Sequence, residues 1–178
     1  MTDTDKLSLS LNGEIREGRH VMAIRVYYED TDFSGIVYHA NFLRFMERGR
    51  TNYLRLLGAE QSVLFAEADA ETPGTFSSEV GTGSREENTT NQKTGFAFVV
   101  RSMQLEFLRP ARMDDILTVV TVPHEVKGAS MMLAQEVRRG DELLIEAKVK
   151  VAFIAEGRAR PIPKALRLLM KADQDAGA

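Results

Sequence analysis

VYYEDTDFSGIVYHANF, residues 26–42, decides the fold, because a strand pattern ends in this stretch and a helix pattern begins. Apolar residues alternate with smaller or polar ones from 20 to 28, which is the period of a β-strand. Turn residues, among them a Ser-Gly pair, fill the middle of the stretch. Asp32 and His39 lie seven positions apart within it. A carboxylate and an imidazole this close to a strand–helix junction are candidates for catalysis.

A long helix is predicted directly after this stretch, over about residues 42–57. Its apolar residues recur at intervals of three and four and form one continuous face. Asn41 is the predicted N-cap, and Gly58 is the predicted residue just beyond the C-cap. Gly49 lies on the apolar face, where glycine costs about 1 kcal/mol relative to alanine, so the helix is expected to lie close against a sheet. The apolar face consists of Phe42, Phe45, Met46, Gly49, Tyr53, Leu56 and Leu57.

Strand patterns fill the second half of the chain. Residues 96–107 are apolar and aromatic, and their alternation changes phase near Val100-Arg101, which predicts a β-bulge. DDILTVVTVPHEV, MMLAQEV and residues 143–153 follow, joined by the turns KGAS and RRGDE, so the strands are expected to be antiparallel. A short helix is predicted after Pro163. One long helix and about five antiparallel strands predict an α+β fold.

The chain is long enough for one domain with a sizeable core. Residues 1–19 are predicted to be a flexible tail, 20–160 the folded domain, and 161–178 a short helix and tail. Within the domain, 66–95 is a polar insertion that is expected to be mobile and dispensable for folding, or else to cover the binding site. One helix covers only one face of the sheet, so a homodimer or homotetramer is expected to bury the remaining apolar surface.

Composition excludes several classes of function. A net charge of −3 and a pI of about 5.7 argue against a nucleic-acid-binding protein. The absence of cysteine rules out disulfides, thiolate metal sites and a cysteine nucleophile, and the presence of only three histidines argues against a metal site. No G-x-S-x-G elbow is present. No cofactor is expected. No stretch is long enough to span a membrane and the N-terminus is polar, which predicts a cytoplasmic protein.

Two stretches, YYEDTDFSGIVYHANFLRFMERGRTNYLR and FVVRSMQLEFLRPARMDDILTV, resemble the hotdog-fold acyl-CoA thioesterases. They are most similar to the Tol–Pal-associated (YbgC-type) branch, which is related to 4-hydroxybenzoyl-CoA thioesterase. The resemblance covers about residues 20–155, apart from the insertion at 66–95. The family fold is a long central helix wrapped by an antiparallel sheet, which agrees with the predicted order of elements.

The resemblance implies that Asp32 is the catalytic carboxylate, as nucleophile or as general base. It implies that the backbone N–H of His39 polarises the thioester carbonyl, with the imidazole orienting water or assisting proton transfer. The chemistry is sound, because a carboxylate can attack a thioester or deprotonate a water that does, and a helix N-terminus offers donors to an oxyanion. Gly35 is expected to let the backbone approach the thioester. Val37, Tyr38 and Asn41 are expected to shape the loop and its junction with the helix.

Other assignments stay open at the level of sequence. Arg109 and Arg112 could bind the phosphates of coenzyme A or could be solvated charges at strand ends. The resemblance implies an acyl-CoA or acyl-carrier-protein substrate, and leaves room for peripheral association with the inner membrane. The alternative function is a non-catalytic acyl-thioester or carrier-protein binding scaffold linked to envelope maintenance or phospholipid synthesis. A hotdog-fold dehydratase fits less well, because it would usually pair its carboxylate and histidine differently.

Overall fold

The computed structural model describes residues 12–59, 96–155 and 157–177. In chain order, a β-hairpin and a turn of 3₁₀-helix lead into one long helix, and five further strands and a closing helix follow. The elements are β1 (Glu14–Arg16), β2 (Arg19–Arg25), η1 (Tyr28–Asp30), α1 (His39–Leu56), β3 (Ala97–Phe107), β4 (Ile116–Val126), β5 (Ser130–Arg139), β6 (Glu142–Ala155), β7 (Arg158–Ala159) and α3 (Lys164–Ala176).

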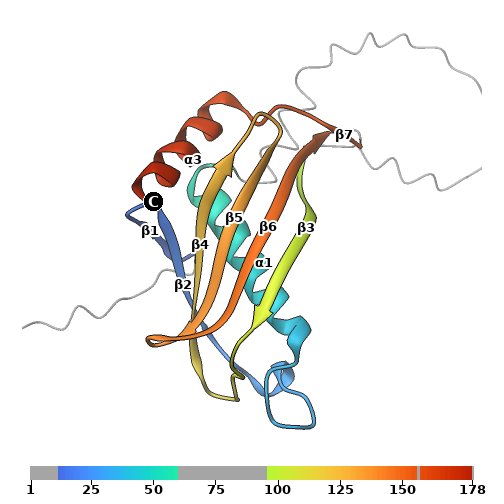
Figure 1. Cartoon of the computed structure of the whole chain (residues 1–178), viewed down its shortest axis with the longest axis vertical. Coiled ribbons are helices and arrows are strands. Elements are labelled where there is room, and N and C mark those ends of the chain that lie inside the picture. Colours follow the sequence, from blue (N-terminus) through green and yellow to red (C-terminus); the bar gives the residue numbers. More distant parts are fainter. Residues whose placement is uncertain (1–11, 60–95, 156, 178) are drawn as a thin grey trace, which may run out of the picture.

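The strands form one antiparallel sheet in the order β1-β2-β4-β5-β6-β3, and β7 pairs with β6. The helix α1 packs against one face of this sheet, with its N-terminus and the preceding loop at the lower end of Figure 1. The predicted α+β fold is confirmed: five long strands wrap one long helix, and the two shortest strands, β1 and β7, add to them. Among the described residues, none of the helices could cross a membrane.

Close contact between α1 and the sheet depends on Gly49. A Cβ atom at this position would lie 2.9 Å from Val119 Cγ1 and 3.0 Å from Thr121 Oγ1, both on β4. Beside it, Gln135 of β5 accepts a 2.7 Å hydrogen bond from Arg50 and donates 2.9 and 2.8 Å bonds to the Met46 carbonyl and the Thr121 hydroxyl. The prediction that Gly49 brings the helix close to a sheet is therefore confirmed.

The two ends of α1 differ in how well they were predicted. Gly58 has φ +81°, and its N–H donates to the Arg55 carbonyl while that of Ala59 donates to Leu54, so the predicted C-terminal stop is confirmed. The predicted N-cap is wrong, because the helix begins at His39 with Tyr38 as N-cap. Asn41 lies inside the first turn, where its side chain is used for a tertiary contact instead.

The N-terminal boundary also needs correction. Residues 14–19 were assigned to a flexible tail, but β1 pairs with β2 in a hairpin, with Glu14 opposite Val21. The first strand was expected to reach residue 28, yet β2 ends at Arg25 and Tyr28 begins a 3₁₀-helix. The bulge predicted near Val100 is confirmed by a register shift between Val100 and Ser102. Residues 1–11 and the insertion at 66–95 lie outside the described residues.

The helix predicted after Pro163 is α3, which packs against β4. The Tyr53 hydroxyl of α1 donates a 3.0 Å hydrogen bond to Asp173 Oδ2 of α3. Burial and the adjacent carboxylate raise the pKa of Tyr53, so this phenol stays protonated. The contact ties the C-terminal helix to the central one.

His20, on β2, makes the stability of the fold sensitive to acid. The side chain is fully buried, its Nε2 lies 2.8 Å from the Asn12 carbonyl, and its Nδ1 has no partner among the described residues. Burial lowers the pKa of His20 below its ordinary 6.5. Below that value the unfolded chain binds a proton that the folded chain excludes, so the free energy of unfolding should fall as the pH falls.

Denaturant unfolding at roughly pH 7.5 and pH 5 measures this effect. The variant His20→Gln keeps an N–H donor for the Asn12 carbonyl but does not titrate, so it should lose less stability between the two values. An equal loss of stability in the variant and in the natural chain would show that His20 is not the source of the acid sensitivity.

Candidate active site

Asp32 lies in a tight turn between η1 and α1. Its N–H donates to the Ile36 carbonyl at 2.9 Å, and its carbonyl accepts from the Gly35 N–H at 2.9 Å. Gly35 has φ +72°, a conformation that favours glycine. The Asp32 side chain is exposed, and its Oδ1 accepts a 2.8 Å hydrogen bond from the Ser34 N–H. Oδ2 has no partner in the described part of the chain, which leaves it available to a substrate.

The turn is fastened to the first turn of α1 through the backbone of Asp30. The Asp30 carbonyl accepts hydrogen bonds from the Tyr38 N–H and from Asn41 Nδ2, both at 2.9 Å. A β-bridge between Thr31 and Val37 closes the loop between them. Asn41 is buried, so its amide replaces water for this carbonyl. The loop carrying Asp32 and the start of α1 therefore form one unit.

His39 is the first residue of α1, so its backbone N–H has no acceptor within the helix and lies at the positive end of the helix dipole. The centroid of its imidazole ring lies 4.3 Å from the centroid of the Tyr38 ring. It lies 6.3 Å from the centroid of the Phe107 ring at the end of β3, in an edge-on arrangement. The ring of Phe107 in turn lies 6.3 Å from Phe42. The N-terminus of α1 is thereby held against the end of β3.

The remaining predicted site residues either support the Asp32 loop or lie on the surface of the protein. Val37 is 4% exposed, and its N–H donates to the Ala111 carbonyl, so this residue ties the Asp32 loop to the segment that contains Ala111. Arg109 is already paired with Glu142 at 3.1 Å. Arg112 forms a bridge with Ile36 and so lies beside the loop. The structure thus brings Arg112 beside the candidate site, whereas the guanidinium group of Arg109 is already paired with Glu142.

Phe107 was missed from the sequence. It lies 68 positions from His39, so no local spacing could relate the two residues. The signal was indirect: the chain places an exposed aromatic at the end of a strand, immediately before LRPAR. Only the pairing of β3 with β6 and the packing of α1 bring it to the helix N-terminus.

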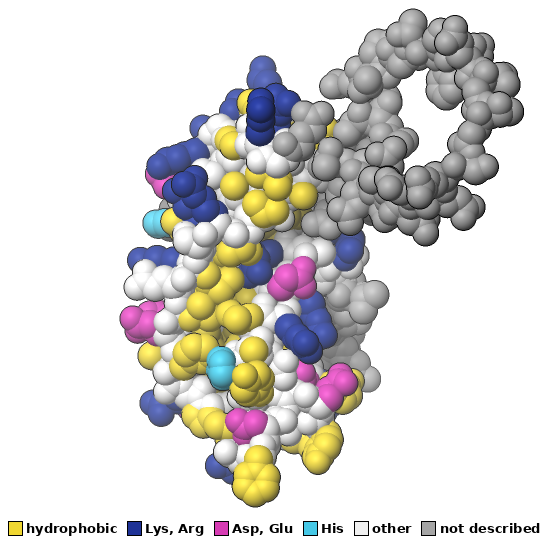
Figure 2. All heavy atoms as spheres, turned by 90° about the vertical axis from the view of Figure 1, so that its right-hand side faces the viewer, with side chains coloured by type: hydrophobic (Ala, Val, Ile, Leu, Met, Phe, Trp, Pro, Cys, Tyr) yellow, Lys and Arg dark blue, Asp and Glu magenta, His cyan; other side chains and the backbone are white. Residues whose placement is uncertain are grey.

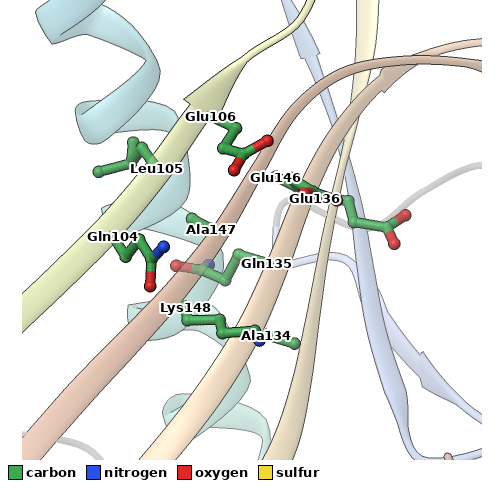
Figure 3. Close-up of a pocket in the computed structure, with 9 residues that line it drawn as sticks. All are labelled: Gln104, Leu105, Glu106, Ala134, Gln135, Glu136, Glu146, Ala147 and Lys148. Carbon is green, nitrogen blue, oxygen red and sulfur yellow. The ribbon is translucent and has the colours of Figure 1, made fainter.

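A hollow of about 300 Å³ lies over β3, β6 and β5 (Figure 3). Glu106, Glu146 and Glu136 lie directly opposite one another across these strands. These three carboxylates repel one another and donate no hydrogen bond to an oxyanion, whereas Gln104 and Lys148, which also line the hollow, carry donors. Within the described residues no cluster of three or more acidic or histidine side chains could hold a metal ion. The Asp32 loop therefore remains the candidate site for thioester chemistry.

The chain is similar in sequence and in structure to known thioesterases. The sequence profile of the family described as the Thioesterase superfamily matches residues 34–146, beginning two positions after Asp32. Acyl-CoA thioesterase YbgC of Haemophilus influenzae is 37% identical over 139 residues, which cover 78% of this chain and 83% of that protein. Acyl-CoA thioester hydrolase YbgC of Escherichia coli O6:H1 is 34% identical over 146 residues, which cover 80% of this chain and 89% of that protein.

Among solved structures, a probable thioesterase from Bartonella henselae is 35% identical and has a TM-score of 0.66, covering 82% of this chain and 99% of that one. A 1,4-dihydroxy-2-naphthoyl-CoA thioesterase from Synechocystis, 17% identical with a TM-score of 0.66, covers 86% and 96% and supports the fold alone. The chain is a hotdog-fold protein, as its resemblance implied. It belongs to the Thioesterase superfamily.

Proposed function

We propose that this chain is a hydrolase that cleaves an acyl-CoA thioester to a free acid and coenzyme A, with Asp32 as its catalytic carboxylate. The observation that carries the proposal is the hydrogen-bonded unit that joins the Asp32 turn to the N-terminus of α1. It places a carboxylate and the His39 N–H, which has no acceptor within the helix, on one hydrogen-bonded element. The thioesterase relatives support the same chemistry.

Two routes fit the geometry, and both consume one water. In the first, Asp32 Oδ2 attacks the carbonyl carbon, the C–S bond breaks, the thiolate takes up a proton, and water hydrolyses the resulting anhydride. In the second, Asp32 removes a proton from the water whose oxygen attacks the carbonyl carbon, the C–S bond then breaks, and the departing thiolate takes up that proton. In both, the His39 N–H at the start of α1 stabilises the negative charge on the carbonyl oxygen. Ser34 keeps the carboxylate oriented through Oδ1.

The acyl group is proposed to lie in the seam between α1 and β3, on the side of the helix that carries His39. A cavity of about 90 Å³ lies farther along this seam. The walls from β3, β5 and β6 are apolar, while α1 contributes Glu47, Arg50 and Thr51. An acyl chain that enters at the helix N-terminus would bury its methylene groups against the apolar wall. The apolar lining consists of Leu54, Phe98, Val100, Met131, Leu133 and Val151.

The test is release of free thiol from a panel of acyl-CoA substrates with short, long and aromatic acyl groups, and from one acyl carrier protein. Hydrolysis of any member supports the enzyme and ranks its acyl preference. Binding without hydrolysis across the whole panel would favour the scaffold function instead.

The location of the protein is also a proposal. The resemblance to the Tol–Pal-associated branch supports a cytoplasmic enzyme with peripheral contact with the inner membrane. Fractionation of cells, in the presence and absence of the Tol–Pal components, measures it. Recovery entirely outside the cytoplasm and inner membrane would contradict it.

Assembly into a homodimer or homotetramer is proposed from the edge of the sheet. β3 is the last strand in the sheet order, and most of its side chains are exposed on both faces, whereas those of β4 mostly alternate between buried and partly buried. Figure 2 shows hydrophobic side chains gathered along this side of the molecule. A long apolar edge strand is a template for pairing, so β3 is expected to pair with β3 of a second copy.

Val100→Lys should weaken this assembly, because Val100 lies on β3, is 47% exposed and would be buried by a second copy. Light scattering at micromolar concentration should show an oligomer for the natural chain and a smaller species for the variant. Leu168→Lys, which changes an exposed residue of α3, is the matched control and should leave the mass unchanged. A monomeric natural chain would contradict the proposal.

A further inference from the structure

Arg50 is a buried cation on α1. Its side chain is 9% exposed, and its Nη1 donates a 2.7 Å hydrogen bond to Gln135 Oε1. A guanidinium group has five N–H donors, and Arg50 makes no other hydrogen bond and no ion pair with the described residues. Gln135 is neutral and does not balance the charge. A buried charge with so few partners is costly, which indicates that a ligand satisfies the remaining donors.

The cavity of about 90 Å³ in the seam between α1 and β3 is lined by Arg50. The other polar residues of its lining are Glu47 and Thr51, and the rest of the lining is apolar. Glu47 is exposed, and its Oε1 accepts a 2.6 Å hydrogen bond from the Thr51 hydroxyl. Burial lowers the pKa of Arg50, and the nearby Glu47 carboxylate opposes this shift. The cavity therefore combines a cationic donor and an anionic acceptor in otherwise apolar surroundings.

Arg50 lies on the same side of α1 as His39, about 20° from it around the helix axis. Gln135, which binds Arg50, also donates to the Met46 carbonyl, so the guanidinium group lies at about the level of Met46. Met46 is about 10 Å along the axis from His39. An extended carbon chain advances about 1.2 Å per bond, so an acyl group bound at the His39 N–H would reach Arg50 after about eight to ten carbons.

The two charges at the cavity select the chemical group at this distance. A methyl group would leave the buried guanidinium donors without an acceptor. A carboxylate would accept from Arg50 but would be repelled by Glu47. A hydroxyl group is neutral, and it can accept from Arg50 while it donates to Glu47. The pair of side chains therefore fits a hydroxyl group better than either alternative.

We propose that the cavity binds a hydroxyl group on the acyl chain, about eight to ten carbons from the thioester, with Arg50 as donor and Glu47 as acceptor. The preferred substrates are medium-chain acyl thioesters that are hydroxylated at their far end. The inference rests on the proposed thioesterase function and names its substrate class. Arg50 and Glu47 are distant from the reacting atoms, so they select the acyl group and take no part in the chemical step.

The test compares four coenzyme A thioesters of equal carbon number, which carry ω-hydroxydecanoyl, β-hydroxydecanoyl, decanoyl and decanedioyl groups. The natural chain should have a kcat/KM for the ω-hydroxy substrate at least about 10-fold above that for each of the others. The β-hydroxy substrate carries its hydroxyl group next to the thioester and controls for polarity alone. An equal or higher kcat/KM for any of the other three would overturn the proposal.

Arg50→Met removes the donor and keeps an unbranched side chain. It should abolish the preference for the ω-hydroxydecanoyl over the decanoyl substrate. Arg48→Met is the matched control, because Arg48 is exposed and lies about 180° from His39 around α1, and it should keep the preference. An equal loss of kcat/KM with both substrates in Arg50→Met would show that Arg50 only supports the packing of Gln135, and would overturn the proposal.

Glu47→Gln tests the acceptor at an exposed position, where a substitution leaves the core unchanged. Loss of the negative charge should raise kcat/KM for the decanedioyl substrate about 3-fold relative to the ω-hydroxydecanoyl substrate. An unchanged ratio would contradict the role of Glu47. If Arg50→Met does not fold, this variant and the comparison of four substrates on the natural chain still decide the proposal.

Failure of the proposed function is distinguishable from failure of this inference. A natural chain that hydrolyses other acyl-CoA thioesters but none of these four would refute the inference alone. If no thioester is hydrolysed, the thioesterase function fails, and titration calorimetry with the ω-hydroxydecyl and decyl thioethers of coenzyme A decides the binding site. Tighter binding of the hydroxylated thioether, lost in Arg50→Met and kept in Arg48→Met, would support the site, and equal binding of the two thioethers would refute it.

Discussion

Asp32→Asn is expected to remove thioester hydrolysis while leaving the fold intact. The amide keeps the shape of the side chain, and its oxygen can still accept the hydrogen bond from the Ser34 N–H. It cannot act as an anionic nucleophile or as a base at neutral pH. The loss should appear in kcat and be on the order of 10²-fold or more.

The control is Asp141→Asn, the same change in the exposed turn between β5 and β6. Both variants should have unfolding transitions close to that of the natural chain, and only Asp32→Asn should lose activity. A folded Asp32→Asn protein that keeps most of its kcat would show that the catalytic carboxylate lies elsewhere.

Gly49→Leu is expected to give the largest loss of stability. Even a single Cβ atom at this position would approach Val119 and Thr121 to about 3 Å, and these side chains belong to a β-strand that cannot move away freely. Replacing glycine in a helix gains about 1 kcal/mol, but overpacking by a whole leucine costs more. The free energy of unfolding should fall by at least about 2 kcal/mol.

Gly128→Leu is the matched control, because no atom lies within 4 Å of a Cβ placed there and its backbone is not in the left-handed region. Denaturant unfolding of the two variants should separate packing from the general effect of losing a glycine. Equal stability of Gly49→Leu and the natural chain would mean that α1 does not lie as close to β4 as described.

Local patterns were sufficient to predict the elements that their own side chains define. Period-two alternation predicted the long strands and their hairpins, and Gly49 and Gly58 predicted the close helix contact and the helix end. The bulge in β3 was visible as a change of phase at Val100. These features depend on neighbours in sequence, so a single chain reveals them.

Features that depend on distant contacts were missed. Asn41 has the side chain of an N-cap, but its amide bonds the Asp30 carbonyl and the helix begins two residues earlier. The β1–β2 hairpin is too short for a periodic signal, and its turn at Gly18 lies against the Asp173 carbonyl of α3. Phe107 reaches His39 only through the sheet. In each case tertiary structure decided the outcome.

The sequence identified Asp32 and His39 as a candidate pair, because only seven positions separate them. It did not identify the frame, meaning the contacts that hold the two residues together. The frame is the pair of hydrogen bonds that the Asp30 carbonyl accepts from Tyr38 and Asn41. No sequence pattern indicated that the backbone of Asp30 supplies this support.

The central claim is that the thioester carbonyl binds at the N-terminus of α1 beside Asp32 and is polarised there. The most direct measurement is the carbonyl stretching frequency of an acyl-CoA bound to Asp32→Asn, by isotope-edited infrared difference spectroscopy with ¹³C at the carbonyl. Hydrogen bonding to the His39 N–H and the positive end of the helix dipole should weaken the C=O bond and lower its frequency relative to the same thioester in water. A frequency equal to or above that in water would contradict the account.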